Sequence, residues 1–207
     1  NKAIEFHLQG NILEATKYYK YCIEKGLNNS RVFSNYGIIL KDQGKLKEAA
    51  LLTKKALKIK PNFAIANCNL GNILRRLENF KEAEIYTRKA IKINPNFPNA
   101  YLTLGNILCD IKKLNEAEIS TRKAISLKPD YIEAYNNLGK ILKDQGKLKE
   151  AELSQRKAVE LKPNIANYHY NLGIIQNELG DLKEAEISTC KAIELKPELG
   201  DAHYNLG

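Results

Sequence analysis

The sequence predicts an all-α solenoid, a stack of helix–turn–helix repeats, and three periodic features carry that prediction. Glycine recurs every 34 residues, at Gly37, Gly71, Gly105, Gly139, Gly173 and Gly207. Alanine and proline columns keep the same step, and the ten residues LKDQGKLKEA occur twice, from Leu40 and from Leu142. A fixed period of this length is typical of stacked repeats in which each unit packs on its neighbours.

The unit Ala64–Phe97 shows how each repeat forms two helices. Apolar residues at helical spacing predict a first helix, which the pair Glu78-Asn79 ends. A second apolar set follows and stops at Asn94-Pro95. The two sets are Ala66, Leu70, Ile73, Leu74 and Leu77, then Phe80, Ala83, Ile85, Ala90 and Ile91. Small residues in the glycine and alanine columns allow the two helices to pack closely.

Five full units and two partial ones fill the chain, so we expect a single array over residues 1–207. The full units are Ser30–Phe63, Ala64–Phe97, Pro98–Tyr131, Ile132–Ile165 and Ala166–Leu199. Asn1–Asn29 lacks the start of its first helix, and Gly200–Gly207 holds only the start of another. Neither end has a polar capping helix, which solenoids need for solubility, so we expect the chain to be part of a longer protein.

Composition narrows the classes of function. No stretch is apolar for long enough to span a membrane, and no signal peptide is visible, so we expect a cytoplasmic protein without a membrane partner. The four cysteines form no CxxC pair, which favours reduced thiols over a zinc or disulfide framework. The net charge is +9, from 33 Lys and Arg against 24 Asp and Glu, which raises the question of an acidic partner.

These columns resemble the tetratricopeptide repeat (TPR) family over the whole chain. The resemblance implies a right-handed superhelix in which the first helix of each unit faces a concave groove. One column departs from the family pattern, because the bulky aromatic usual late in the second helix is replaced at Thr53, Thr87, Thr121, Gln155 and Thr189. We expect a thinner contact there. The first segment departs further, with Ala3 in the glycine column and Leu27 in the proline column.

The candidate binding site is a polar column two residues before each glycine: Asn35, Asn69, Thr103, Asn137, Asn171 and Asn205. It resembles the asparagine ladder of the TPR superhelix in O-GlcNAc transferases, where the side chains hold an extended peptide backbone. A carboxamide has both a donor and an acceptor, so it can pair with one peptide residue. The alternative is that these asparagines bridge neighbouring helices or are solvated.

Other columns of the same face would set preference for the peptide. The basic candidates are Lys41, Arg75 and Lys143, and Tyr170 could grip an aliphatic or proline side chain. By count the groove is neutral, with six basic and six acidic residues. Asn72 and Asn106 match the asparagine of the clamp with which some TPR domains hold chaperone tails, but no lysine occupies the clamp column. We therefore reject chaperone-tail binding and keep both asparagines as peptide-binding candidates.

The excess positive charge follows the second helices. Glu84, Glu118 and Glu152 precede Arg88, Arg122 and Arg156 by four residues, the favourable order for ion pairs on a helix. This pattern favours a solvated outer face. Exposed aromatic residues that would stack on bases do not interleave with these charges, so we expect no nucleic-acid partner.

Motif analysis predicts no catalytic residue, no metal site and no cofactor. P-loop, G-x-S-x-G and H-E-x-x-H spacings are absent from the sequence. His169 and His203 share a column on successive units, too far apart to share a metal without other ligands, and we expect them to be packed or hydrogen-bonded. The leading interpretation is a protein–protein interaction scaffold that binds an extended peptide. The alternatives are the substrate-recognition region of a larger transferase and head-to-tail self-association.

Overall fold

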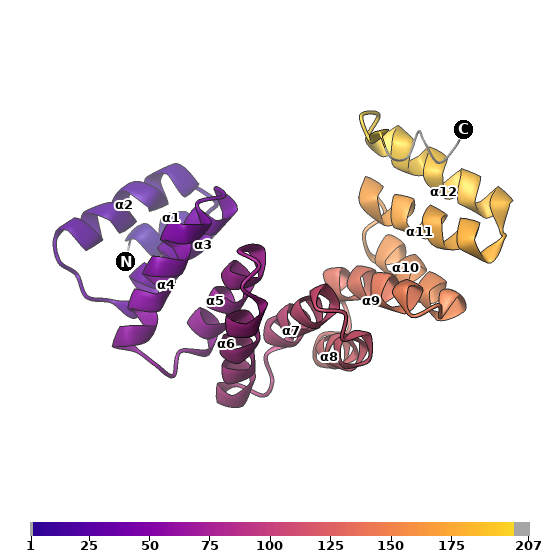
Figure 1. Cartoon of the computed structure of the whole chain (residues 1–207). Helices are drawn as coiled ribbons and strands as arrows, with labels where there is room; N and C mark the ends of the chain where they lie inside the picture. The colour runs from indigo at the N-terminus through magenta and orange to yellow at the C-terminus, as the bar shows by residue number, and fades with distance from the viewer. Residues whose placement is uncertain (1, 201–207) are drawn as a thin grey trace. The chain divides into compact units, whose positions relative to one another are not determined.

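A computed structural model describes residues 2–200, which form helices joined by short turns (Figure 1). The chain divides into two compact units, residues 1–107 and 108–207. The helices of the first unit are α1 (Lys2–Leu8), α2 (Ile12–Glu24), α3 (Ser30–Asp42), α4 (Leu46–Ile59), α5 (Ala64–Arg76) and α6 (Phe80–Ile93). Helix α7 (Pro98–Asp110) contains the boundary. The second unit holds α8 (Leu114–Leu127), α9 (Ile132–Asp144), α10 (Leu148–Leu161), α11 (Ala166–Leu179) and α12 (Leu182–Leu195).

The predicted all-α repeat fold is confirmed, and residues 2–200 contain no strand. In the unit Ala64–Phe97, the two helices of the structure are α5 and α6, separated at the predicted break. Asn79 caps α6, because its side chain accepts a hydrogen bond from the backbone N–H of Glu82 at 3.4 Å. Asn29 caps α3 in the same way.

The turn after each first helix contains a residue with a left-handed backbone, and these residues also recur every 34 positions. They are Gly10, Gly44, Glu78, Lys112, Gly146 and Gly180. Glycine adopts this conformation without steric cost. Glu78 and Lys112 adopt it with φ of 59° and 62° although they carry a Cβ, which costs ~1 kcal/mol each. The repeat geometry therefore outweighs the local preference at these two turns.

In the first unit, the glycine column brings the two helices of a repeat close together. A Cβ added at Gly37 would lie 2.5 Å from Thr53 Oγ1, and one at Gly71 would collide with Thr87 Oγ1. Both threonines are fully buried, and each hydroxyl donates a 2.8 Å hydrogen bond to the carbonyl four residues earlier. Threonine thus fills the space against glycine and keeps its hydroxyl satisfied inside the core.

The second unit repeats this packing with one change. Gly173 faces Thr189, whereas Gly139 faces Gln155, which is fully buried. The core around them is formed by Leu138, Leu142, Ala151 and Ile175. The longer side chain of Gln155 extends past the glycine and reaches polar groups of α9 and α11, as described below.

Candidate functional site

In the first unit, the ladder asparagines lie partly buried and point their amide groups at the preceding repeat. Asn35 Nδ2 donates to the hydroxyl of Tyr19 at 3.3 Å. Asn69 Nδ2 donates to Ser34 Oγ at 3.4 Å. Thr103, the exception in the ladder, is buried and lies 3.7 Å from Cys68 through their side-chain hetero atoms. Each contact joins one first helix to an earlier helix, so these side chains help to align successive repeats.

In the second unit, the ladder is part of a carboxamide network. Asn171 Nδ2 donates to Asn136 Oδ1 at 2.8 Å, and Asn136 Nδ2 donates to Asn137 Oδ1 at 3.4 Å. Gln155 Nε2 donates to the same Asn136 oxygen at 3.2 Å and to the carbonyl of Tyr168 at 2.9 Å. A buried residue of α10 therefore holds the orientation of the amides on α9 and α11.

These contacts define what the ladder can offer to a ligand. Asn69 and Asn171 each donate one of their two amide N–H groups within the chain, as expected for bridging side chains. Their carbonyl oxygens accept no hydrogen bond from any residue between 2 and 200. An amide fixed in this way presents an acceptor, which pairs with the backbone N–H of a peptide.

The basic candidates on the same face are tied to neighbouring groups. Lys41 Nζ lies 2.9 Å from Asp42 Oδ1, and its backbone carbonyl accepts a 2.8 Å hydrogen bond from the Arg76 guanidinium. Lys143 Nζ lies 3.4 Å from Glu178 Oε1 and 3.8 Å from Asp144 Oδ1. Neutralised cations of this kind position side chains more than they attract an anionic ligand.

The remaining candidates occupy the first helices as predicted. Asn72, Arg75, Asn106 and Tyr170 are all partly buried. Asn205 lies outside the described residues, as does His203. His169 is hydrogen-bonded as expected, because its Nε2 donates to the carbonyl of Pro163 at 2.7 Å.

Two residues of this site were not among the candidates predicted from the sequence. Tyr19 is buried, and its hydroxyl accepts the hydrogen bond from Asn35. Burial raises the pKa of Tyr19 above its ordinary value. It stands 34 residues before Thr53, so it keeps an aromatic in the column where later repeats have none. The sequence marks Gln155 only as an exception in that column. Its length was the available signal, because only a longer side chain reaches across to α9.

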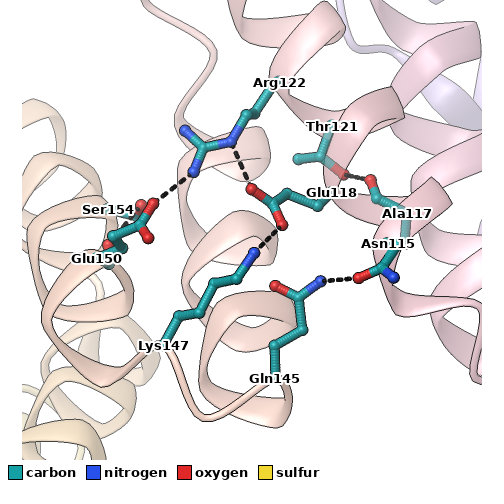
Figure 2. A network of polar contacts seen from close by, with 9 residues as sticks. All are labelled: Asn115, Ala117, Glu118, Thr121, Arg122, Gln145, Lys147, Glu150 and Ser154. Atoms are coloured by element: carbon teal, nitrogen blue, oxygen red, sulfur yellow. Dashed lines mark hydrogen bonds and ion pairs between the residues drawn. The ribbon is translucent and has the colours of Figure 1, made fainter.

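Outside this face, ion pairs join the second helices (Figure 2). The three predicted pairs at i,i+4 spacing are confirmed, at 2.7 Å for Glu84–Arg88 and 2.8 Å for Glu118–Arg122 and Glu152–Arg156. Glu118 also accepts a 2.7 Å hydrogen bond from Lys147, and Arg122 reaches Glu150 of the next repeat at 2.8 Å. The hydrogen bond from Lys147, together with that from Arg122, lowers the pKa of Glu118 to about 2.

Neither a membrane-spanning helix nor a metal cluster occurs in the part of the chain that the structure describes. No helix within residues 2–200 is long and apolar enough to cross a membrane. The same residues bring together no group of three or more His, Cys, Asp or Glu side chains that could hold a metal ion.

Family models match most of the chain. Models of the tetratricopeptide repeat match residues 64–97, 86–119, 132–165 and 166–199, and a TPR repeat model matches residues 105–146. Together these matches run from residue 64 to residue 199 without a gap. A search among curated proteins finds no match to the sequence.

Solved structures with the same fold include YrrB, described as a TPR protein with an unusual peptide-binding site. It is 24% identical with a TM-score of 0.67, over 92% of this chain and 98% of its own. A thermophilic TPR protein from Thermus thermophilus is 20% identical with a TM-score of 0.74, over 86% and 96% of the two chains. A chain of the APC/C hetero-tetramer Cut9–Hcn1 is 16% identical with a TM-score of 0.90, over 99% of this chain and 41% of its own.

At these identities the structural similarities establish the fold alone, and the family assignment rests on the repeat models. The repeats support a role as a protein–protein interaction scaffold. With its 34-residue helix pairs, its glycine and alanine columns and its run of matching repeat models, this chain belongs to the tetratricopeptide repeat family.

Proposed function

We propose that the first-helix face of this scaffold binds an extended segment of another protein through the asparagine ladder. The observation that carries the proposal is the fixed orientation of Asn69 and Asn171, each of which donates one N–H within the chain while its oxygen remains an acceptor. YrrB, which shares the fold, is described as having a peptide-binding site, and this supports peptide binding as a function of such a fold.

The expected register follows from the spacing of helices and of peptide residues. Equivalent helices of stacked repeats are ~10 Å apart, and an extended peptide advances ~3.3 Å per residue. One ladder asparagine therefore serves about every third residue of the peptide. Because the contacts are made to backbone N–H groups, binding depends weakly on peptide sequence. Lys41 and Lys143 already pair with carboxylates of the chain, so they add little electrostatic attraction for the peptide.

The test uses a displayed library of random twelve-residue peptides, selected on the array, with affinities then measured by fluorescence anisotropy. Each lost hydrogen bond costs ~1 kcal/mol, so the double variant Asn69→Ala and Asn171→Ala should weaken binding about tenfold or more. Asn62→Ala is the matched control, because Asn62 is an exposed asparagine in a turn, outside the first helices. We expect it to change affinity by less than about threefold.

A chemical change in the peptide tests the same contact from the other side. Three peptides are compared, each methylated at every third backbone nitrogen and each starting one residue later than the one before. In one of the three, methylation removes the N–H groups assigned to the ladder, and only that peptide should lose affinity by about as much as the double variant does. Equal affinity of the double variant and the parent array, or a selection that retains no peptide, would refute groove binding by the ladder.

A further inference from the structure

Second helices of successive repeats are joined by ion pairs between residues 28 positions apart. Lys54 lies 2.8 Å from Glu82 in the first unit. In the second unit Arg122 lies 2.8 Å from Glu150, and Arg156 lies 3.6 Å from Glu184. Because the spacing is constant, the same register places Lys20 of α2 opposite Glu48 of α4.

This first ion pair is not formed, and a cavity lies in its place. Lys20 and Glu48 are both exposed and line a hollow of about 250 Å³ between α2 and α4. The floor and walls are mostly hydrocarbon, with Lys20, Glu24 and Glu48 at the rim. The apolar lining residues are Ile23, Tyr36, Leu40, Leu51 and Leu52. We call this hollow the α2–α4 groove.

Leu51 adds an exposed apolar side chain to the groove. Its side chain is 58% exposed at the edge of the groove, although leucine gains free energy from burial. Ile85 occupies the same column one repeat later and is 66% exposed, but there Lys54 and Glu82 bridge the two helices. Exposed aliphatic side chains recur in this column, at Ile119, Leu153 and Ile187 as well. Leu51 differs from Ile85 in lining a hollow where the Lys20–Glu48 pair is not formed.

The charge around the groove identifies the chemistry of a partner. Residues 1–107 contain 18 Lys and Arg against 8 Asp and Glu, whereas residues 108–207 contain 15 against 16. The net positive charge of the chain thus resides in the first unit. Lys20 lines the groove, and Lys47 precedes Glu48, which also lines it. These two lysines, with Lys55 and Lys58 further along α4, are exposed and form no ion pair with any carboxylate in residues 2–200.

We propose that the α2–α4 groove docks an acidic segment of another protein, which inserts one aliphatic or aromatic side chain between Lys20 and Glu48. The hollow is smaller than a typical ligand pocket of ~300–1,000 Å³, which suits a single side chain. The surrounding lysines attract acidic residues on either side of this anchor and raise the rate of encounter. A buried anchor with a charged rim is the usual anatomy of a small interface.

The shape of the site selects a protein segment over other anionic partners. A bilayer surface binds apolar side chains that protrude, whereas the apolar residues here line a hollow. Nucleic-acid phosphates approaching the hollow would meet the carboxylates of Glu24 and Glu48 at its rim. A peptide avoids this repulsion because its neutral anchor occupies the hollow and its carboxylates lie toward the flanking lysines.

The probe is a fluorescein-labelled nine-residue peptide with four glutamates on each side of a central leucine, phenylalanine or alanine. We expect the leucine or phenylalanine peptide to bind the whole chain at least tenfold more tightly than the alanine peptide. Leu51→Ser should weaken that binding about fivefold or more, and Lys20→Glu with Lys47→Glu should weaken it further. All three substituted residues are exposed, so circular dichroism should report unchanged helix content.

Two matched variants test whether the peptide binds in this groove. Ile85→Ser removes the equivalent aliphatic of the next repeat and should leave affinity within twofold. The Asn69→Ala and Asn171→Ala variant should keep the difference in affinity between the leucine and alanine peptides, because neither asparagine lines the groove. Equal binding of the alanine peptide, equal loss in Ile85→Ser, or loss of that difference in the asparagine variant would overturn the proposal. The proposal would also be overturned if Leu51→Ser weakened the binding of phosphatidylserine vesicles or duplex DNA but left peptide binding unchanged.

Discussion

Replacing Glu118 by glutamine should lower the stability of the second unit in a pH-dependent manner. Glu118 accepts hydrogen bonds from Lys147 at 2.7 Å and from Arg122 at 2.8 Å, and its side chain is only 15% exposed. The change to glutamine keeps the shape of the side chain and removes its charge. The Arg122–Glu150 pair, which joins the two repeats, remains in place (Figure 2).

The magnitude follows from the difference in pKa between the folded and unfolded chains. The pKa of Glu118 falls from an ordinary 4.5 to about 2 in the folded chain, chiefly through the Lys147 hydrogen bond. A difference of this size corresponds to at most ~3 kcal/mol. Lys147 and Arg122 are 43% and 47% exposed, so solvent screens the interaction, and we expect about 1–2 kcal/mol.

The sign of the pH dependence is set by which state binds the proton. Between pH 2 and 4.5 the unfolded chain is protonated at this residue and the folded chain is not. The stabilisation is therefore complete above about pH 5 and is lost as the pH falls through this window. The difference in urea midpoint between parent and Glu118→Gln should be largest at pH 6–7 and shrink toward pH 3.

A matched control lies in the same column two repeats later. Glu186 is exposed, and the residue four positions on is Cys190 in place of an arginine. Glu186→Gln should therefore leave both the midpoint and its pH dependence unchanged. A difference for Glu118→Gln that stays constant from pH 3 to pH 7, or an equal loss for Glu186→Gln, would refute the assignment of this stability to the Glu118 ion pairs.

Three further predictions concern packing, backbone and thiol chemistry. Gly71→Leu should destabilise the array by ~1–3 kcal/mol, because the added side chain would collide with Thr87, and thermal unfolding that matched the parent would contradict this packing. Glu78→Gly should raise stability by ~0.5–1 kcal/mol, because φ at this residue is 59°, and a lower melting temperature would show that the side chain contributes more than the strain costs. Cys190 is exposed and should react with Ellman's reagent at once. Cys68 should react only on unfolding, because burial raises its pKa to about 11. Equal reaction rates of the two thiols in the native protein would exclude this burial of Cys68.

The repeat frame could be predicted because it depends on backbone contacts that recur with the period. The unit Ala64–Phe97 forms two helices with the predicted break between them, since its glycine and alanine columns sit where the helices pack most closely. The hydrogen bonds of the ladder could not be predicted in the same way. Asn69 contacts Ser34, which is 35 positions earlier, so its partner depends on a neighbouring column whose residue changes from repeat to repeat.

The charged outer face shows the same limit at longer range. Glutamate and arginine four positions apart on one helix could be paired from the sequence, because helix geometry alone brings them together. Pairs between helices also require the correct rotation of successive repeats. Lys54 meets Glu82, yet Lys20 does not meet Glu48 although the spacing is identical. The hollow between α2 and α4 therefore depends on local packing that the period does not encode.

Departures from the repeat pattern are where we expect specificity to arise. Positions that repeat without change align the helices, and they offer the same surface to any partner at each step. Tyr19 and Gln155 break one buried column, and each reorganises the hydrogen bonds of a ladder asparagine or of its neighbour. Lys20, left without its ion pair, lines a hollow that has no such bridge. The backbone and the spacing are the same in every repeat. A partner that distinguishes one repeat from another therefore has to contact positions at which the side chain or its pairing changes.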